Sequence, residues 1–346
     1  MRNSPDFCND PMLYPLIRPL IFAQDAENAH ETGLELLNNL RGLIPPTHIR
    51  KPVSVMGLEF PNPLGLAAGM DKNAEYLPGL SRLGFGFIEV GTVTPRAQPG
   101  NPKPRLFRLT RHHSIINRMG FNNKGVDVLL DNVRQFPDRD FILGINIGKN
   151  LSTAVENALD DYALALEKAY SAADYITINV SSPNTPGLRN LQSEDALEAL
   201  LKGIAETRKA LQDKHQFNRP IALKVAPDLD QRSIAPISQL LLDYGIDALI
   251  ATNTTLDKSL VAGHRYADEA GGLSGAALTD KSREILYQFH QQLGNDLPII
   301  SVGGIDSAEE AQLRLDLGAK LVQIYSALVF KGPGLVRQIL KSIEPH

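Results

Sequence analysis

The sequence predicts an α/β protein, a (β/α)8 barrel of the TIM type with a small N-terminal helical extension. Short apolar, β-branched runs recur eight times from Val53 onward, helical segments lie between several of them, and a polar or glycine-rich cluster follows each run. Strands that alternate with helices pair in parallel through right-handed crossovers, and eight of them in about 290 residues is the count of a closed barrel. A doubly wound open sheet is the competing arrangement.

The first segment of the chain differs from the rest. Residues 1–12 are polar, and we interpret them as a disordered tail or as sequence preceding a true start at Met12. Leu13–Ala23 is apolar apart from one arginine and contains two prolines. Ala26–Leu40 has the leucine spacing of a helix, with Asp25 as its N-cap. We therefore expect a polar leader, a helical extension and a barrel, at residues 1–12, 13–44 and 45–346.

Two roles are open for this extension, which Pro45-Pro46 ends. Its apolar residues either attach the protein to a membrane or cover one end of the barrel. Residues 1–50 hold four Arg against six Asp and Glu, so membrane attachment would be hydrophobic rather than electrostatic.

The eight expected strands are too short and too rich in β-branched residues to be helices, and most have the apolar character of strands buried on both faces. They are Pro63–Ala68, Phe87–Val90, Phe141–Asn146, Tyr175–Val180, Ile221–Val225, Ala248–Thr252, Ile299–Val302 and Leu321–Tyr325. Helical spacing appears between them, at residues 197–204, 234–242 and 308–317.

Polar residues gather where these strands end, which is where the active sites of such barrels lie. Lys72 and Lys224 are both at strand ends. A lysine in a closed pocket pairs with an anion, stabilises a reduced, electron-rich cofactor or forms a Schiff base. Five amides at strand ends or in loops suit a flat heterocycle that carries imide and carboxylate groups. They are Asn117, Asn146, Asn179, Asn184 and Asn253.

Gly303-Gly304 and Ser326, after the last two strands, predict a phosphate site. The glycine pair is expected to open a helix whose free N–H groups and dipole suit an anion, at the place where phosphate-binding barrels hold phosphate. Glycines that only relieve crowding at the turn are the alternative.

Composition excludes several classes of function. The chain has 35 Lys and Arg against 39 Asp and Glu, without the basic footprint of a nucleic-acid-binding protein. It has no apolar run of about 18 residues and no secretory signal, so we expect a soluble-bodied intracellular protein. The single cysteine, Cys8, excludes an intramolecular disulfide framework and a multi-cysteine zinc site.

The motifs at the strand ends closely resemble those of dihydroorotate dehydrogenase, the flavin enzyme of pyrimidine biosynthesis. The longest and most specific are INRMGFNN (116–123) and NVSSPNTPGLR (179–189). The others are NPLGLAAGMDK (62–72), EVGTVTPRAQPGNPKPRLFRL (89–109), GINIGKN (144–150), KVAPD (224–228), IATNTTLD (250–257), GGLSG (271–275), VGGI (302–305) and QIYSALVFKGP (323–333). The resemblance runs from about Leu13 to the C-terminus.

The resemblance points further to the quinone-dependent, membrane-associated class. That class carries a helical N-terminal extension, and a serine base where soluble relatives carry cysteine. Ser182 occupies the base position, and Cys8 is far from the barrel sequence. The class implies peripheral association with the cytoplasmic face of the inner membrane.

Carried over motif by motif, the resemblance implies three sets of site residues. Those for FMN are Ala68, Gly69, Thr92, Asn146, Asn179, Lys224, Thr252, Gly275, Gly304, Tyr325 and Ser326. Those for the substrate are Lys72, Asn117, Arg118, Met119, Gly120, Phe121, Asn179, Asn184, Asn253 and Thr254. Those for a quinone tunnel between the N-terminal helices and the barrel are His30, Arg108 and Tyr325.

The implied reaction removes a proton from C5 of (S)-dihydroorotate through Ser182, while C6 delivers a hydride to flavin N5. Because serine is a weak base, Thr185 or a trapped water is expected to relay the proton. Lys224 is expected to stabilise the anionic reduced flavin, which ubiquinone or menaquinone then reoxidises through the tunnel. A soluble acceptor such as fumarate or NAD is the nearest alternative, and a non-catalytic flavin-binding barrel is a second.

Overall fold

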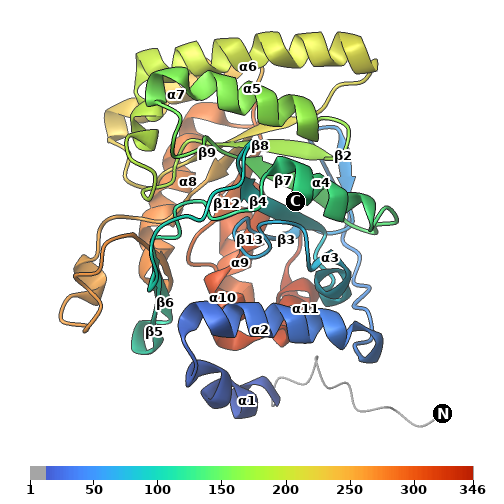
Figure 1. Cartoon of the computed structure of the whole chain (residues 1–346), viewed down its shortest axis with the longest axis vertical. Helices are drawn as coiled ribbons and strands as arrows, with labels where there is room; N and C mark the ends of the chain where they lie inside the picture. The colour runs from blue at the N-terminus through green and yellow to red at the C-terminus, as the bar shows by residue number, and fades with distance from the viewer. Residues whose placement is uncertain (1–12, 346) are drawn as a thin grey trace.

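The computed structural model describes residues 13–345, and its centre is a closed barrel of eight parallel strands (Figure 1). The strands follow one another around the barrel in chain order, which confirms the predicted barrel and excludes the open sheet. They are β3 (Leu64–Leu66), β4 (Phe87–Val93), β7 (Ile142–Ile147), β8 (Tyr175–Asn179), β9 (Ile221–Val225), β10 (Ala248–Ala251), β12 (Ile299–Val302) and β13 (Ala319–Ile324). Each overlaps one of the eight expected runs.

Helices surround the barrel and connect its strands (Figure 1). They are α3 (Leu77–Leu80), α4 (Val126–Arg134), α5 (Ala158–Ala169), α6 (Glu194–His215), α7 (Gln231–Asp243), α8 (Thr279–Leu293), α9 (Ala308–Asp316), α10 (Ser326–Lys331) and α11 (Gly334–Ser342). The three segments with helical spacing fall in α6, α7 and α9. One expectation was wrong: Gly303-Gly304 does not open a helix, because α9 begins at Ala308, where the Ser307 side chain accepts a hydrogen bond from the Glu310 N–H.

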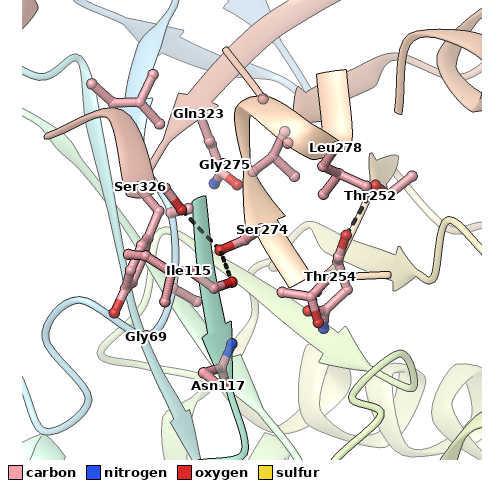
Figure 2. Close-up of a pocket in the computed structure, with 18 of the residues that line it drawn as sticks. Gly69, Ile115, Asn117, Thr252, Thr254, Ser274, Gly275, Leu278, Gln323 and Ser326 are labelled. Atoms are coloured by element: carbon pink, nitrogen blue, oxygen red, sulfur yellow. Dashed lines mark hydrogen bonds between the residues drawn. The ribbon is translucent and has the colours of Figure 1, made fainter. Parts of the chain in front are cut away.

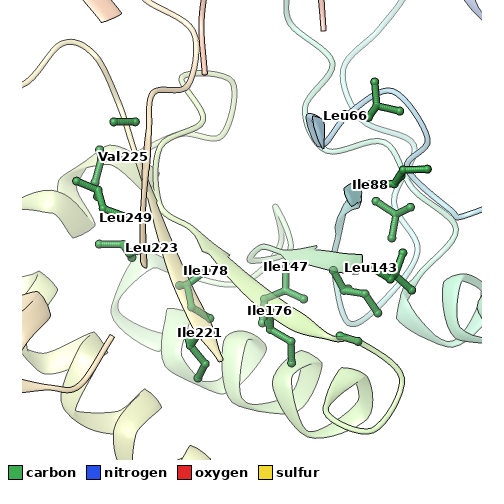
Figure 3. Close-up of a cluster of buried hydrophobic side chains, with 14 of the residues drawn as sticks. Leu66, Ile88, Leu143, Ile147, Ile176, Ile178, Ile221, Leu223, Val225 and Leu249 are labelled. Carbon is green, nitrogen blue, oxygen red and sulfur yellow. The ribbon is translucent and has the colours of Figure 1, made fainter. Parts of the chain in front are cut away.

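The alternation of side chains along each strand separates two buried layers. Apolar residues that point outward pack beneath the helices, and Figure 3 shows part of this layer, with Leu223 and Val225 of β9 among its members. The residues at the alternate positions of each strand point into the barrel, where Ala222 belongs to a smaller apolar cluster. By the same alternation Lys224 of β9 and Glu89 of β4 project into the barrel interior, so the fold itself places both charges there.

Two small sheets were not predicted from the sequence. A hairpin of β1 (Val53–Val55) and β2 (Leu58–Phe60) places Phe60 against Phe87 inside the barrel, with ring centroids 5.3 Å apart. An antiparallel sheet of β5 (Leu106–Leu109), β6 (Ser114–Asn117) and β11 (Gly272–Gly275) carries residues that face the carboxyl ends of the barrel strands.

The N-terminal extension forms α1 (Leu13–Phe22), α2 (Ala26–Asn39) and a single 3-10 turn, η1 (Arg41–Leu43), as the sequence suggested. Asp25 caps α2, accepting hydrogen bonds from the N–H groups of Glu27 and Asn28 at 2.9 and 3.1 Å. The polar leader and Cys8 lie outside the described residues, and the division at residues 44 and 45 stays a prediction. No helix within residues 13–345 is long and apolar enough to cross a membrane.

Polar contacts hold this extension on the barrel. The Tyr14 hydroxyl donates to the carbonyl of Val329 at 2.5 Å, and Arg18 donates to that of Phe330 at 3.0 Å. Glu27, buried on α2, accepts three hydrogen bonds from Arg105, the shortest at 2.7 Å. Breaking one partner of such a buried pair costs about 3–5 kcal/mol, so this contact fixes α2 in place.

Candidate active site and adjoining cavity

A polar cavity lies at the carboxyl ends of the barrel strands, and we call it the mouth cavity. Residues from the ends of most barrel strands line it, together with β6 and β11 (Figure 2). It is the position at which barrels of this kind carry their chemistry, because the loops there converge while the strands hold them rigidly.

Hydrogen bonds join the amides and hydroxyls on one side of this cavity. The Thr92 hydroxyl donates to Asn146 Oδ1 at 2.6 Å, and Asn179 Nδ2 donates to Thr92 Oγ1 at 2.9 Å. Asn253 Nδ2 donates to Ser181 Oγ, which in turn donates to Asn179 Oδ1, both at 2.9 Å. Side chains tied in this way cannot turn away from a ligand, so the network presents a fixed pattern of donors and acceptors.

Behind this network lies Glu89, which is fully buried. Its carboxylate accepts hydrogen bonds from Asn146 Nδ2 at 2.8 Å, Tyr175 Oη at 2.9 Å and Gln323 Nε2 at 3.0 Å. These donors satisfy a charge that would otherwise be very costly to bury. Glu89 therefore orients Asn146 and Gln323 from inside the barrel.

Both predicted lysines reach the mouth cavity. Burial lowers the pKa of Lys72 to about 8, with the nearby Arg105 charge adding to the shift and Glu27 opposing it. Burial also lowers the pKa of Lys224, and Glu89 opposes that shift. Within the described residues neither amine has a hydrogen-bond acceptor, so an anionic ligand would supply what each lacks.

Ser182 lies on the cavity wall in the loop after β8. It is buried, and its hydroxyl oxygen accepts a hydrogen bond from the N–H of Asn184 at 3.2 Å. Asn184 Nδ2 donates to Asn117 Oδ1 of β6, also at 3.2 Å. The loop is therefore closed against the antiparallel sheet, with Ser182 beneath it.

Glycines and hydroxyls line the opposite side of the cavity. Ser326 Oγ and Ser274 Oγ lie 2.9 Å apart, and Ser274 also donates to the carbonyl of Ile115 (Figure 2). Gly303 and Gly304 have φ values of 115° and 74°, and a Cβ at Gly304 would come within 2.4 Å of the Thr279 backbone. Only glycine fits this turn, because a side chain at Gly304 would collide with the Thr279 backbone.

A second cavity lies beneath the N-terminal helices, and we call it the apolar cavity. Side chains of α1 and α2, such as Ile21 and Leu37, face Met70 and Val329 of the barrel across it. Its few polar groups are Tyr14, His30, Arg108 and Tyr325. Burial lowers the pKa of His30 to about 4, with the Lys72 charge adding to the shift, so this imidazole is neutral at physiological pH.

Comparison with known proteins assigns the chain to a family. The family model for dihydroorotate dehydrogenase matches residues 51–346. The chain belongs to the dihydroorotate dehydrogenase family. It is 54% identical to the dihydroorotate dehydrogenase (quinone) of Chromobacterium violaceum, over 97% of this chain and 98% of the relative. It is 53% identical to the enzyme of the same name from Thiobacillus denitrificans, over 96% and 99%.

Solved structures agree with this assignment. The crystal structure of DHODH from Eimeria tenella in complex with ferulenol superposes with a TM-score of 0.86 at 34% identity, covering 94% of this chain and 93% of that one. The ligand-free form gives a TM-score of 0.85 at 36% identity, covering 92% and 94%. The dihydroorotate dehydrogenase fold is thus shown over more than nine-tenths of the chain.

Most of the residues predicted for flavin and substrate line the mouth cavity. They are Ala68, Gly69, Lys72, Thr92, Asn117, Met119, Gly120, Phe121, Asn179, Ser182, Asn184, Lys224, Thr252, Asn253, Thr254, Gly275, Gly304, Tyr325 and Ser326. The tunnel residues His30, Arg108 and Tyr325 line the apolar cavity. The structure thus places these residues on the two cavities, and the individual role of each residue stays a prediction.

Three predicted residues do not lie on the wall. Asn146 is buried behind Thr92 and Asn179. Thr185 is buried in the Ser182 loop but away from the cavity surface. Arg118 points outward, where it pairs with Glu269 at 2.6 Å and stacks on Phe107. The backbone of its motif follows the cavity wall, but its side chain crosses to the far side of the antiparallel sheet. Arg118 can therefore contribute only its backbone to the cavity.

The sequence reasoning missed Glu89, Gln323 and Ser274. A glutamate inside a run of buried strand residues was a signal for the first, since such charges persist only where partners satisfy them. Gln323 lines the cavity, and its Oε1 is buried without a hydrogen-bond partner among the described residues. That orphaned acceptor, together with the glycine turns and Lys224, fits a dihydroorotate dehydrogenase flavin, whose ring carries an imide N–H.

Proposed function

We propose that this protein oxidises (S)-dihydroorotate to orotate with FMN as its flavin and passes the electrons to a membrane quinone, in pyrimidine biosynthesis. The observation that carries the proposal is the wall that the two cavities share. Tyr325, Leu106 and Ile115 line both of them, so a polar site for the substrate and an apolar site for a quinone lie on either side of one position.

The polar side suits dihydroorotate. Lys72 would pair with the substrate carboxylate, while Asn117, Asn184 and Asn253 offer uncharged donors and acceptors for the imide ring. Asn184 donates to Asn117, and Asn253 donates to Ser181, so all three are held in position before the substrate arrives, which reduces the entropy lost on binding.

Oxidation breaks one C–H bond at C5 and one at C6 of the substrate and forms the C5=C6 double bond. Ser182 removes the C5 proton, and Thr185 or a water passes it outward. When bound, the flavin accepts the hydride equivalent from C6 and later releases its two electrons to the quinone. Lys224, buried within the barrel beside the cavity, stabilises negative charge there.

FMN, rather than a dinucleotide, fits the hydroxyl and glycine side of the mouth cavity. Ser326, Gly303 and Gly304 would receive a single terminal phosphate, as in other barrels that bind phosphate after their last two strands.

The apolar side suits a quinone. Its walls are aliphatic and aromatic, and neutral His30 and Arg108 provide the polar contacts that a quinone carbonyl needs. Tyr325 also stays protonated, because burial raises its pKa to about 12.

The exposed leucines of α1 support peripheral attachment to the membrane. The exposed fraction is 73% for both Leu16 and Leu20, beside the apolar cavity that α1 helps to line. Such side chains can enter the lipid interface and bring the cavity to the quinone pool.

We expect the whole chain to sediment with lipid vesicles, and the double variant Leu16→Ser/Leu20→Ser to stay in solution. The control is Leu164→Ser on α5, a residue with 41% exposure, which should sediment like the wild type.

The first test of the proposed function is an anaerobic visible spectrum of the purified protein. Dihydroorotate should bleach the flavin band, and a ubiquinone analogue should restore it. Recovery with fumarate or NAD alone would keep the substrate and overturn the acceptor. A protein that stays colourless after reconstitution with FMN would overturn the proposal entirely.

A further inference from the structure

A charged cluster outside the cavity walls joins the loops that follow β8, β9 and β10. It consists of Arg189 in the turn η5 (Leu188–Gln192), Asp228 after β9, Thr255 after β10 and Lys281 on α8, and we call it the Asp228 network. No step described so far uses these side chains.

Asp228 is the centre of this network. Its Oδ1 accepts hydrogen bonds from Thr255 Oγ1 at 2.5 Å and Lys281 Nζ at 2.6 Å. Its Oδ2 accepts from Arg189 Nη1 at 2.7 Å and from the N–H of Leu256 at 2.9 Å. Burial raises the pKa of Asp228, but these hydrogen bonds outweigh it and leave the pKa below its usual value, so the carboxylate stays charged.

The remaining nitrogens of Arg189 reach two different loops. Nε donates to the carbonyl of Ser181 at 3.0 Å, and Nη2 donates to that of Thr254 at 2.7 Å. Ser181 directly precedes Ser182, and Thr254 lines the mouth cavity. One planar group thus joins the backbone of the serine loop to the backbone of the 253–254 loop. A lysine, which is a point charge on a flexible stem, cannot hold three acceptors in this fixed geometry.

We propose that Arg189, oriented by Asp228, is a positioning residue that sets the distance between Ser182 and the substrate held at residues 253–254. The inference rests on the proposed function, in which Ser182 removes the C5 proton. A displacement of about 1 Å can lower a rate about 100-fold, so the effect falls on proton removal. Transfer of electrons to the quinone occurs across the Tyr325 wall, where the network makes no contact.

The exposure of the network favours a positioning role over a purely structural one. The side chains of Arg189 and Asp228 are 18% and 20% exposed, at the rim of the barrel rather than in its core. Partly exposed ion pairs contribute little to stability, whereas their geometry still fixes the loops they join. Lys281 provides the matched comparison, because it binds Asp228 and Thr255 without reaching either loop carbonyl.

The test uses the whole flavin-loaded enzyme with dihydroorotate carrying either protium or deuterium at C5, and follows flavin reduction in an anaerobic stopped-flow instrument. For Arg189→Met we expect reduction to slow about 100-fold and the C5 isotope effect to increase, because proton removal becomes more limiting. Reoxidation of the reduced enzyme by a quinone analogue should stay unchanged. Lys281→Met should slow reduction by less than about fivefold, the value of an exposed pair.

Arg189→Lys and Asp228→Asn keep the proposal testable if Arg189→Met fails to fold, and both should show the increased C5 isotope effect with a smaller loss of rate. An unchanged C5 isotope effect, or an equal loss in Lys281→Met, would overturn the positioning role. Ser182→Ala is measured in parallel: if it reduces flavin at the wild-type rate, the base assignment has failed, whatever the outcome for Arg189.

Discussion

The two cavities on either side of Tyr325 are built in opposite ways. In the mouth cavity, hydrogen bonds between side chains of different loops hold the amides and hydroxyls on one side, and Glu89 supports them from inside the barrel. In the apolar cavity, side chains of α1 and α2 face the barrel mainly through van der Waals contact. Proton and hydride transfer requires side chains fixed in position, whereas passage of a quinone requires a cavity of matching shape that excludes water. The difference predicts that substitutions in one cavity leave the other half-reaction intact.

The largest expected effect is on the polar side. Ser182→Ala should lower the rate of flavin reduction by dihydroorotate by about 10²–10⁴-fold, the usual contribution of a general base. Flavin content and quinone reoxidation of chemically reduced enzyme should not change. Stopped-flow absorbance measures both, with Ser193→Ala, an exposed serine further along the same connection, as the control. If Ser182→Ala also lost the quinone half-reaction, the two cavities would not act independently.

The next effect is on the apolar side. Gly33 of α2 lines the apolar cavity, and a Cβ there would meet no atom within 4 Å, so Gly33→Leu fits the helix and extends into the space a quinone would use. We expect kcat/KM for the quinone to fall about tenfold to hundredfold, which corresponds to roughly 1–3 kcal/mol of overpacking, with flavin reduction unchanged. Gly42→Leu, at an exposed glycine outside the cavity, should match the wild type.

A smaller effect depends on pH. Because the pKa of Lys72 in the free protein is about 8, the amine must take up a proton before it binds an anion at higher pH. The affinity for orotate should therefore be constant below pH 8 and fall about tenfold per pH unit above it. Spectral titration from pH 7 to about 9.5 checks this. Lys72→Gln should bind weakly but without this slope, and an unchanged affinity at the highest pH would exclude Lys72 as the anion partner.

The smallest effect concerns stability. Gly33→Ala should raise the free energy of unfolding by about 1 kcal/mol, because alanine favours the helix and has less backbone freedom than glycine to lose on folding. Urea unfolding measures it, and quinone kinetics should change little. A destabilised variant would mean that α2 needs its glycine for a closer contact than the structure contains.

The position of the polar cavity could be predicted from the sequence because polar residues follow the apolar runs that form the strands. Apolar runs such as Ala248–Ala251 stop at polar residues, and parallel pairing brings those ends to one edge. The family resemblance then named the individual positions. The antiparallel sheet was not predicted, because β6 and β11 lie far apart in the chain and neither has a long alternating pattern of apolar and polar residues.

Side-chain direction was the other limit. The motif that contains Arg118 follows the cavity wall, but nothing in the sequence indicates that this guanidinium crosses to Glu269. The apolar cavity was expected only from the family resemblance, because the residue pattern alone does not indicate it. The leucine spacing of α2 predicts a buried face, but not that part of this face encloses space instead of packing against the barrel.

The bond from Tyr14 to Val329 joins residues 315 positions apart, and a Cβ at Gly332 would lie 2.2 Å from the Tyr14 ring. The docking place of α1 therefore does not exist until almost the whole chain has left the ribosome. At about 5–20 residues per second, α1 waits for tens of seconds with its apolar face uncovered. During translation α1 is free to meet a lipid surface before the barrel that will receive it has formed, so the membrane attachment proposed above can precede folding.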